Sequence, residues 1–125
     1  MKRCLEVVVV DDEEQITELL EMAIRLTSAT SKVHTFNDSI LARDYIQQNP
    51  VDLLITDYKM PVMNGLQLME SAPRLARKIL ISGFVSGFAE DKLQQLNATF
   101  FEKPVTLKAI GKIVSEEEAI IEQSA

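Results

Sequence analysis

The sequence predicts a single α/β domain in which a parallel β-sheet is covered by helices on both faces. Short apolar runs alternate with amphipathic segments, and this strand–helix order occurs five times along the 125 residues. A chain of this length suits one domain, and its 46% content of apolar residues is enough to build a core. Apolar strands that alternate with amphipathic helices indicate a doubly wound parallel sheet with right-handed crossovers.

The expected strands are short and mostly apolar at every position. Such strands are typical of a parallel sheet that is buried on both faces. The second strand is weaker, because polar and apolar residues are mixed in it. The predicted strands cover residues 5–10, 32–36, 53–56, 79–81 and 99–101.

The first three helices are predicted from apolar stripes and capping residues. After Asp11-Asp12, helical spacing connects the apolar residues Ile16, Leu19, Leu20, Ala23 and Ile24. Asn37 or Asp38 can cap a second helix that reaches residue 48, with Leu41 and Tyr45 on one side. Pro50 ends this helix. A third helix is expected from residue 64 or 65 to residue 71, and Pro73 breaks it.

Two further helices complete the pattern. Residues 86–96 form the fourth, and the last begins near Val105. The apolar residues that predict them are Phe88, Leu93 and Leu96 in the fourth helix, and Leu107, Ile110, Ile113 and Val114 in the last. Because the helical pattern persists to the last residues, residues 1–125 are either a complete chain or the N-terminal part of a longer multidomain protein. A homodimer through the last helices is also compatible with the sequence.

Composition argues against several classes of function. The net charge is −6 and the pI about 4.8, so direct binding of nucleic acid by this chain is not expected. The longest apolar run, Val7 to Val10, is far too short to cross a membrane. No secretory signal is recognisable, and the single cysteine, Cys4, cannot form an internal disulfide. The sequence therefore predicts a cytoplasmic protein.

Chemically active residues follow four of the five strands. In a parallel sheet, functional groups gather at the carboxyl ends of the strands. The residues at these ends are Asp11 and Asp12 after the first strand, Asp57 after the third, Ser82 after the fourth and Lys103 after the fifth. Crowded carboxylates repel one another, and Mg²⁺ is the hard cation that such oxygen ligands favour. A lysine and a hydroxyl can contact phosphoryl oxygens, and an aspartate can accept a phosphoryl group.

Each of these residues also has a simpler interpretation. Asp11-Asp12 can cap a helix, Asp57 can end a strand in a turn, and Lys103-Pro104 can belong to an ordinary loop. His34, in the second strand, is more simply a hydrogen-bonded strand histidine than a phosphorylated one. The convergence of Asp11, Asp12, Asp57 and Lys103 on one edge favours the site interpretation.

Four motifs in order, VVVVDDEE, ITDYKMPVMNG, ILISG and FFEKP, resemble the receiver domain of two-component response regulators over residues 5–120. The resemblance implies a flavodoxin-like, five-stranded parallel sheet in the order 2-1-3-4-5. It implies that Asp57 is the phosphoacceptor and that Asp57, Asp12 and, through water, Asp11 bind Mg²⁺, with the backbone carbonyl of Lys59 as a further ligand. It also implies a phosphoryl contact from Lys103, a switch hydroxyl on Ser82, an aromatic switch at Phe100 and, often, a cis bond before Pro104. Pro61 and Gly65 would shape the loop beside the site.

Two departures from the family pattern matter. Asp57 and Ser82 are 82 − 57 = 25 positions apart, several fewer than in many receiver domains, so the segment SAPRLARK must be a shortened helix or a tight connection. Lys59 and Phe84 are a bulky cation and an aromatic at positions that influence phosphoryl lifetime in the family. Both could hinder attacking water, so we expect slow self-dephosphorylation, and decay within seconds would contradict this.

Rival functions lack one part or another. A haloacid-dehalogenase-type phosphatase needs a second aspartate where this chain has Lys59, and a flavodoxin-like cofactor carrier needs a phosphate loop where it has Asp11-Asp12. A pseudo-receiver would have lost an acid or the lysine. The strongest alternative is a module switched by partner binding alone. The sequence favours a signalling phosphoacceptor, not an enzyme, that is loaded by a sensor histidine kinase or phosphotransfer protein and read by a downstream effector domain or protein.

Overall fold

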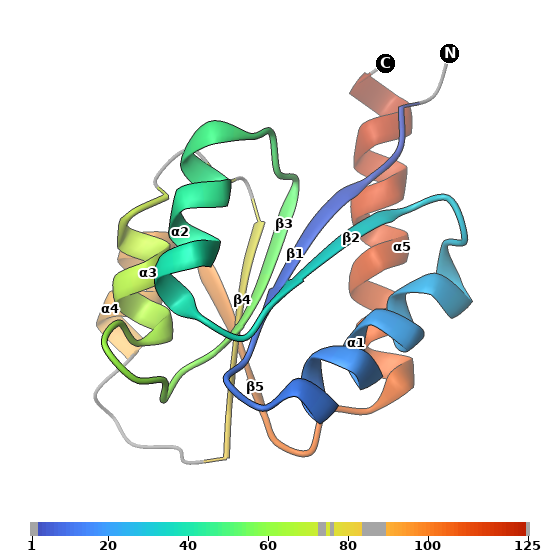
Figure 1. Ribbon diagram of the computed structural model, residues 1–125. Coiled ribbons are helices and arrows are strands. Elements are labelled where there is room, and N and C mark those ends of the chain that lie inside the picture. The colour runs from blue at the N-terminus through green and yellow to red at the C-terminus, as the bar shows by residue number, and fades with distance from the viewer. Residues whose placement is uncertain (1–2, 73–74, 76, 84–89, 125) are drawn as a thin grey trace.

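The structure is a computed structural model that describes residues 3–72, 75, 77–83 and 90–124 of the chain. Strands and helices alternate strictly along it (Figure 1). The strands are β1 (Glu6–Val10), β2 (Lys32–Phe36), β3 (Leu53–Asp57), β4 (Arg77–Ser82) and β5 (Ala98–Glu102). The helices are α1 (Glu14–Thr27), α2 (Ser39–Gln48), α3 (Gly65–Glu70), α4 (Glu90–Leu96) and α5 (Leu107–Ser124).

The five strands form one parallel sheet in the order β2-β1-β3-β4-β5. Helices α1 and α5 lie on one side of the sheet, and α2, α3 and α4 lie on the other (Figure 1). The predicted doubly wound fold and its strand order are therefore confirmed. β1 and β3 are central, and their ends mark the point at which the strand order reverses.

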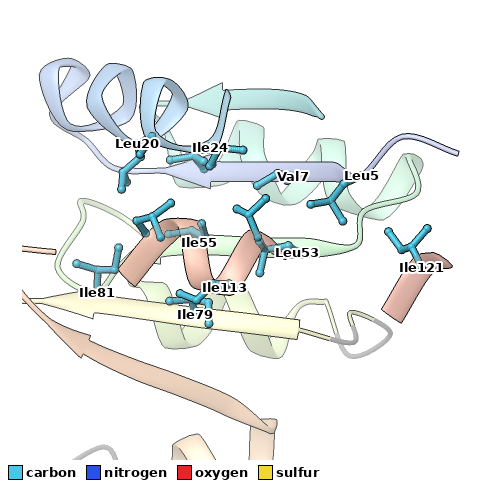
Figure 2. Packing of buried hydrophobic residues seen from close by; sticks show 14 residues of the cluster. Leu5, Val7, Leu20, Ile24, Leu53, Ile55, Ile79, Ile81, Ile113 and Ile121 are labelled. Carbon is cyan, nitrogen blue, oxygen red and sulfur yellow. The ribbon is translucent and has the colours of Figure 1, made fainter. Parts of the chain in front are cut away.

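The sheet separates two apolar cores, because alternate residues of each strand point to opposite faces. Val7, Val9, Leu53 and Ile55 pack against α1 and α5, where Leu20, Ile24 and Ile113 meet them (Figure 2). The second core, on the side of α2, α3 and α4, is formed by Val8, Val10, Leu54, Leu68, Met69 and Leu80. The side chains of β1 from Val7 to Val10 are fully buried, as an interior strand of a two-faced sheet requires.

Side-chain caps fix where two helices begin. The Asp38 carboxylate accepts hydrogen bonds from the amides of Ile40 and Leu41, so Asp38 and not Asn37 caps α2. Asn64 and Gln67 form a reciprocal capping box at the start of α3. α3 has only six residues and ends at Glu70, before the segment SAPRLARK, whose last two residues already belong to β4.

The predicted apolar stripes were partly wrong. Leu19 is 47% exposed and Leu41 59% exposed, because each helix contacts the sheet along a narrower strip than its apolar pattern covers. α1 buries Thr17, Leu20, Ala23 and Ile24, whereas α2 buries Ser39 and Ala42 and packs Tyr45 at the margin of the second core.

Several boundaries also differ from the prediction. β4 begins at Arg77, two residues before its predicted start, α5 begins at Leu107 rather than near Val105, and other strand ends differ by one residue. Of the predicted fourth helix, Glu90–Leu96 is helical, while Phe88 lies outside the described residues, as does Pro73. In the described part of the chain, no helix has the length and apolarity needed to span a bilayer.

Candidate functional site

The fold brings the predicted strand-end residues to one edge of the sheet, here called the carboxyl edge. Asp57 is the last residue of β3 and Ser82 the last of β4, and Asp11 directly follows β1. Lys103 directly follows β5. Carboxylate oxygens of Asp11, Asp12 and Asp57 all lie within 4.8 Å of one another.

Lys103 joins two of these carboxylates. Its Nζ atom lies 3.1 Å from Asp57 Oδ1 and 3.5 Å from Asp11 Oδ2. Burial lowers the pKa of Lys103, but its hydrogen bond and attraction to Asp57, together with those to Asp11, outweigh this, and the pKa is raised. The ammonium is therefore held charged beside the two acids.

The peptide around Asp11 is fixed from three directions. Its amide donates to the carbonyl of Phe36, its carbonyl accepts from Asn37 Nδ2 at 2.8 Å, and its carboxylate accepts from the amide of Glu13 at 2.9 Å. The side chain is buried, and this burial raises the pKa of Asp11. The Glu13 amide and Lys103 lower the pKa, whereas the negative charge of Asp57 raises it further.

Asn37 is a supporting residue whose role the sequence did not reveal. Its side-chain amide donates to the Asp11 carbonyl and, at 3.2 Å, to Thr17 Oγ1. It therefore connects the end of β2 to the acidic loop and to α1. The sequence offered it only as an alternative cap for α2.

The loop after Asp57 folds back tightly onto the strand. The Asp57 carbonyl accepts from Thr56 Oγ1 at 2.9 Å, and the Gly65 amide donates to the Tyr58 carbonyl at 2.8 Å. A Cβ atom at Gly65 would overlap the Asp57 carbonyl oxygen and lie 2.7 Å from Leu80 Cδ1. Gly65 is thus required for the close approach of α3 to the site.

Pro61 forms the other part of this loop. Its carbonyl accepts from the Met63 amide at 2.8 Å across Val62, which has a φ of 71°. The same carbonyl accepts from Ser39 Oγ at 3.4 Å, so the loop is also attached to the start of α2. Pro61 and Gly65 accordingly lie where the sequence predicts them, on either side of the turn beside Asp57.

β4 and β5 are tied together at the carboxyl edge. The amide of Lys103 donates to the carbonyl of Ser82 at 2.9 Å, and Ser82 itself is buried. The Lys103–Pro104 peptide bond is cis, the form that the resemblance implied. Ser82 and Lys103 are therefore held in a fixed relation by their backbones.

Phe100 and Phe101 face opposite sides of β5. Phe101 packs against the core of α1 and α5, whereas Phe100, paired with Leu80 of β4, packs against the core on the α4 side. Only Phe100 is thus placed on the face that carries α4. Its role as a switch stays a prediction. Phe84 lies outside the described residues, and Lys59 is exposed.

The donor set fits a divalent cation. All side-chain donors in the cluster are carboxylate oxygens, and exposed Asp12 joins the buried pair Asp11 and Asp57. Hard oxygen ligands of this kind suit Mg²⁺, which keeps several of its waters. Ligation by the Lys59 carbonyl stays a prediction.

The comparison with known families identifies this arrangement. Residues 7–115 match the model of the response regulator receiver domain. The chain belongs to this family. It is thus a receiver domain of the two-component type, and its strand-end residues coincide with the motifs from which the resemblance was inferred.

Curated relatives contain the domain within longer proteins. A protein-glutamate methylesterase/protein-glutamine glutaminase of Gluconobacter oxydans is 33% identical over 98% of this chain, which spans 36% of that protein. Response regulator GtcR of Aneurinibacillus migulanus is 30% identical over 88% of the chain, which spans 46% of GtcR. The chain thus spans less than half the length of these relatives.

Solved structures share the fold. A CheY-like response regulator receiver domain protein from Methanospirillum hungatei superposes with a TM-score of 0.86 over 98% of this chain and all of its own, at 20% identity. The N-terminal domain of an uncharacterized protein from Wolinella succinogenes gives 0.87 over the same shares, at 21% identity. At these identities the likeness shows the fold alone.

Proposed function

We propose that this receiver domain accepts a phosphoryl group on Asp57 and converts its presence into a change at the surface. The observation that carries the proposal is the position of Lys103, whose ammonium contacts both Asp57 and Asp11 within a three-carboxylate cluster. This is the combination that phosphoryl transfer needs, since its catalysis is mostly positioning and charge neutralisation.

In the proposed transfer, an Asp57 carboxylate oxygen attacks phosphorus, and the bond from phosphorus to the donor's imidazole nitrogen breaks. The electron pair stays on that nitrogen, and the product is an acyl phosphate. Lys103 changes partner from the free carboxylate to a phosphoryl oxygen, and the Ser82 hydroxyl donates to another. Asp11 and Asp12 would hold Mg²⁺, which supplies charge neutralisation between the carboxylates and the phosphoryl oxygens.

The donor we propose is the phosphohistidine of a sensor histidine kinase or phosphotransfer protein. Relatives in which this domain type occurs include an autoinducer 1 sensor kinase/phosphatase of Vibrio harveyi and a cyclic di-GMP phosphodiesterase response regulator of Xanthomonas campestris. A downstream effector domain or protein would read the output. The domain of residues 1–125 acts as a signalling phosphoacceptor, with no enzymatic activity beyond its own phosphorylation and slow self-dephosphorylation.

The output would pass through Ser82 and Phe100. Bonding of Ser82 to the phosphoryl group would draw the end of β4 toward Asp57 and let Phe100 turn inward on the α4 side of the sheet. Lys103 would bond the same phosphoryl group as Ser82. Without it, in Lys103→Ala, we expect that Asp57 still accepts some phosphoryl group but that acceptance no longer produces the surface change.

The deciding experiment adds acetyl phosphate or beryllofluoride with Mg²⁺ and follows intact mass and amide spectra. We expect a Mg²⁺-dependent phosphoryl adduct, and matching spectral changes with beryllofluoride, in the wild type. Asp57→Asn should show neither, while Asp52→Asn, at the opposite edge, should behave as wild type. Silence of the wild type under all these conditions would leave a module switched by partner binding alone.

A further inference from the structure

Lys78 is a buried lysine at the opposite end of β4 from Ser82. It is the second residue of the strand, its exposed fraction is 4%, and it pairs with Leu54 of β3 and Ala98 of β5. Lysine is almost never fully buried without a partner, because removal of its charge from water is costly. Burial lowers the pKa of Lys78 accordingly.

The partners of the ammonium are two backbone carbonyls. Nζ donates to the carbonyl of Leu75 at 2.9 Å and to that of Leu96 at 3.0 Å. No carboxylate within the described ranges forms an ion pair with it, in contrast to Lys103. Lys78 therefore serves as a donor to main-chain oxygens from two segments that lie on either side of it in the sequence.

The Leu96 carbonyl belongs to the carboxyl-terminal end of α4. Carbonyls in the last turn of a helix lack intrahelical partners, and a positive charge there is favourable. The next residue, Asn97, has a φ of 55° and donates its amide to Gln94, and Ala98 already belongs to β5. A single residue, Asn97, thus joins α4 to β5, and the hydrogen bond from Lys78 to the Leu96 carbonyl attaches this junction to β4.

The Leu75 carbonyl belongs to the connection between α3 and β4. Leu75 is buried, and its amide donates to the carbonyl of Ala72 at 3.2 Å. One ammonium on β4 therefore holds this connection and the end of α4 together. At the other end of β4, Ser82 lies in the candidate site, so a single strand connects the site to the attachment point of α4.

We propose that Lys78 is a positioning residue that pins the carboxyl-terminal end of α4 to the sheet, so that α4 pivots about this end when the Ser82 end of β4 rearranges. The pinning is a property of the unmodified protein. Only the pivoting rests on the proposed phosphorylation of Asp57, and the two parts are tested separately.

Lys92 provides a matched control on the same helix. Its Nζ lies 3.4 Å from Glu70 Oε1 of α3, but both side chains are more than two-fifths exposed. An exposed pair of this kind contributes little. Lys92→Met removes a lysine that connects α4 to α3, whereas Lys78→Met removes the buried donor and leaves two carbonyls without it.

The pinning is tested by amide hydrogen exchange on the full chain, without phosphodonor. In Lys78→Met we expect at least tenfold faster exchange at Gln94–Asn97, with less than twofold change in β1 and β3 after correction for global stability. Lys92→Met should change neither. Equal acceleration throughout the molecule, or none at residues 94–97, would overturn the proposal. Lys78→Gln, which keeps a donor, should show a smaller acceleration than Lys78→Met. If the methionine variant fails to fold, Lys78→Gln alone should still accelerate exchange at residues 94–97 more than in β1 and β3, and equal rates would overturn the proposal.

The pivoting is tested with beryllofluoride and Mg²⁺. In the wild type, amide shift changes along α4 should fall from Glu90 toward Leu96, and in Lys78→Met they should extend through Leu96 to Ala98. An identical profile in both proteins would overturn the pivot. Absence of any beryllofluoride response in the wild type would contradict the proposed function of Asp57 and remove the pivot with it, while the exchange result for the pinning would stand.

Discussion

The two edges of the sheet differ in how they neutralise acidic side chains. At the amino edge, where the strands begin, Asp52 accepts two hydrogen bonds from Arg3, at 2.7 and 2.8 Å, and one from the Glu6 amide. Glu117, on α5, lies 3.2 Å from Arg77. At the carboxyl edge, Lys103 is the one cation within ion-pair distance of Asp11 and Asp57 in the described part of the chain, and Asp12 lies in the same cluster.

The pKa directions of Asp52 and Asp11 follow this difference, whereas burial raises the pKa of Glu117 despite its pairing with Arg77. Burial raises the pKa of Asp52, but the hydrogen bonds from Arg3 and Glu6 outweigh it, and the pKa is lowered. Burial also raises the pKa of Asp11, and there the shared Lys103 and the Glu13 amide do not offset it. The charge of Asp52 therefore stabilises the fold, whereas one lysine only partly compensates the three carboxylates at the carboxyl edge and leaves negative charge to bind a cation.

The largest effect is expected from Gly65→Ala, which acts on the shape of the carboxyl edge rather than on its charge. The new methyl group would overlap the Asp57 carbonyl and crowd Leu80, so the free energy of unfolding should fall by about 3 kcal/mol. Urea denaturation measures this loss. Gly83→Ala is the matched control, because its Cβ would lie 3.9 Å from the nearest atom, Lys103 Cβ, and should cost less than about 1 kcal/mol. Equal losses would mean that Gly65 is not specially confined.

The next effect compares a carboxylate at each edge. Asp52→Asn should lower the free energy of unfolding by about 1.5 kcal/mol, because a charged acceptor for Arg3 and the Glu6 amide is lost, and the exposure of Arg3 limits the cost. Asp12→Asn should leave stability within about 0.5 kcal/mol, since Asp12 is exposed, but weaken Mg²⁺ binding about tenfold or more. Chemical denaturation and Mg²⁺ titration measure the two quantities. A stability loss in Asp12→Asn as large as that in Asp52→Asn would contradict the comparison.

The sequence was sufficient to predict the carboxyl edge because its residues occupy positions that topology dictates. Asp57 and Ser82 end apolar strands, and parallel strands must bring such ends together. The two-faced parallel sheet followed from the same patterns, whereas its strand order came from the resemblance. The functional roles of these residues, in contrast, came from the resemblance, and they remain to be tested.

The amino edge and the supporting residues could not be read in the same way. Arg77-Lys78 look like a polar boundary before a strand, yet Lys78 is buried because carbonyls 3 and 18 positions away satisfy its ammonium. Arg3 and Asp52 are 49 positions apart, and no local pattern connects them. Helical periodicity wrongly placed Leu19 and Leu41 on buried faces. It gives the width of the apolar stripe on a helix, not the width of the strip that contacts the sheet.

A smaller effect concerns pH, measured with a chelator present. The pKa of Asp52 is lowered from its usual 3.8, so the unfolded chain binds the proton more readily, and the stability from Asp52 is lost as pH falls through and below that value. The pKa of Asp11 is raised, so the folded chain binds the proton more readily, and the cost of ionised Asp11 disappears as pH falls toward 3.8. Relative to wild type, Asp52→Asn should thus lose less stability on acidification, and Asp11→Asn more. Urea denaturation between pH 3 and 7 measures, for each variant, how its difference from wild type in free energy of unfolding changes with pH. Changes of the same sign in the two variants would contradict the comparison.

The smallest effect tests whether pairing at the amino edge is local or collective. Lys32 Nζ lies 3.8 Å from Glu6 Oε2 and is 63% exposed, whereas His34 Nε2 lies 2.9 Å from the other oxygen of the same carboxylate. Because Glu6 keeps its closer partner, Lys32→Ala should change the free energy of unfolding by less than about 0.5 kcal/mol. Urea denaturation at pH 7 of this variant beside Arg25→Ala, which breaks the exposed Glu21 pair on α1, provides the scale. A loss near that of Asp52→Asn would mean that the amino-edge charges act as one network. The amino edge would then be a cooperative cluster of charges rather than a set of separate pairs, and it would differ from the carboxyl edge, where three carboxylates share one lysine, in its cooperativity.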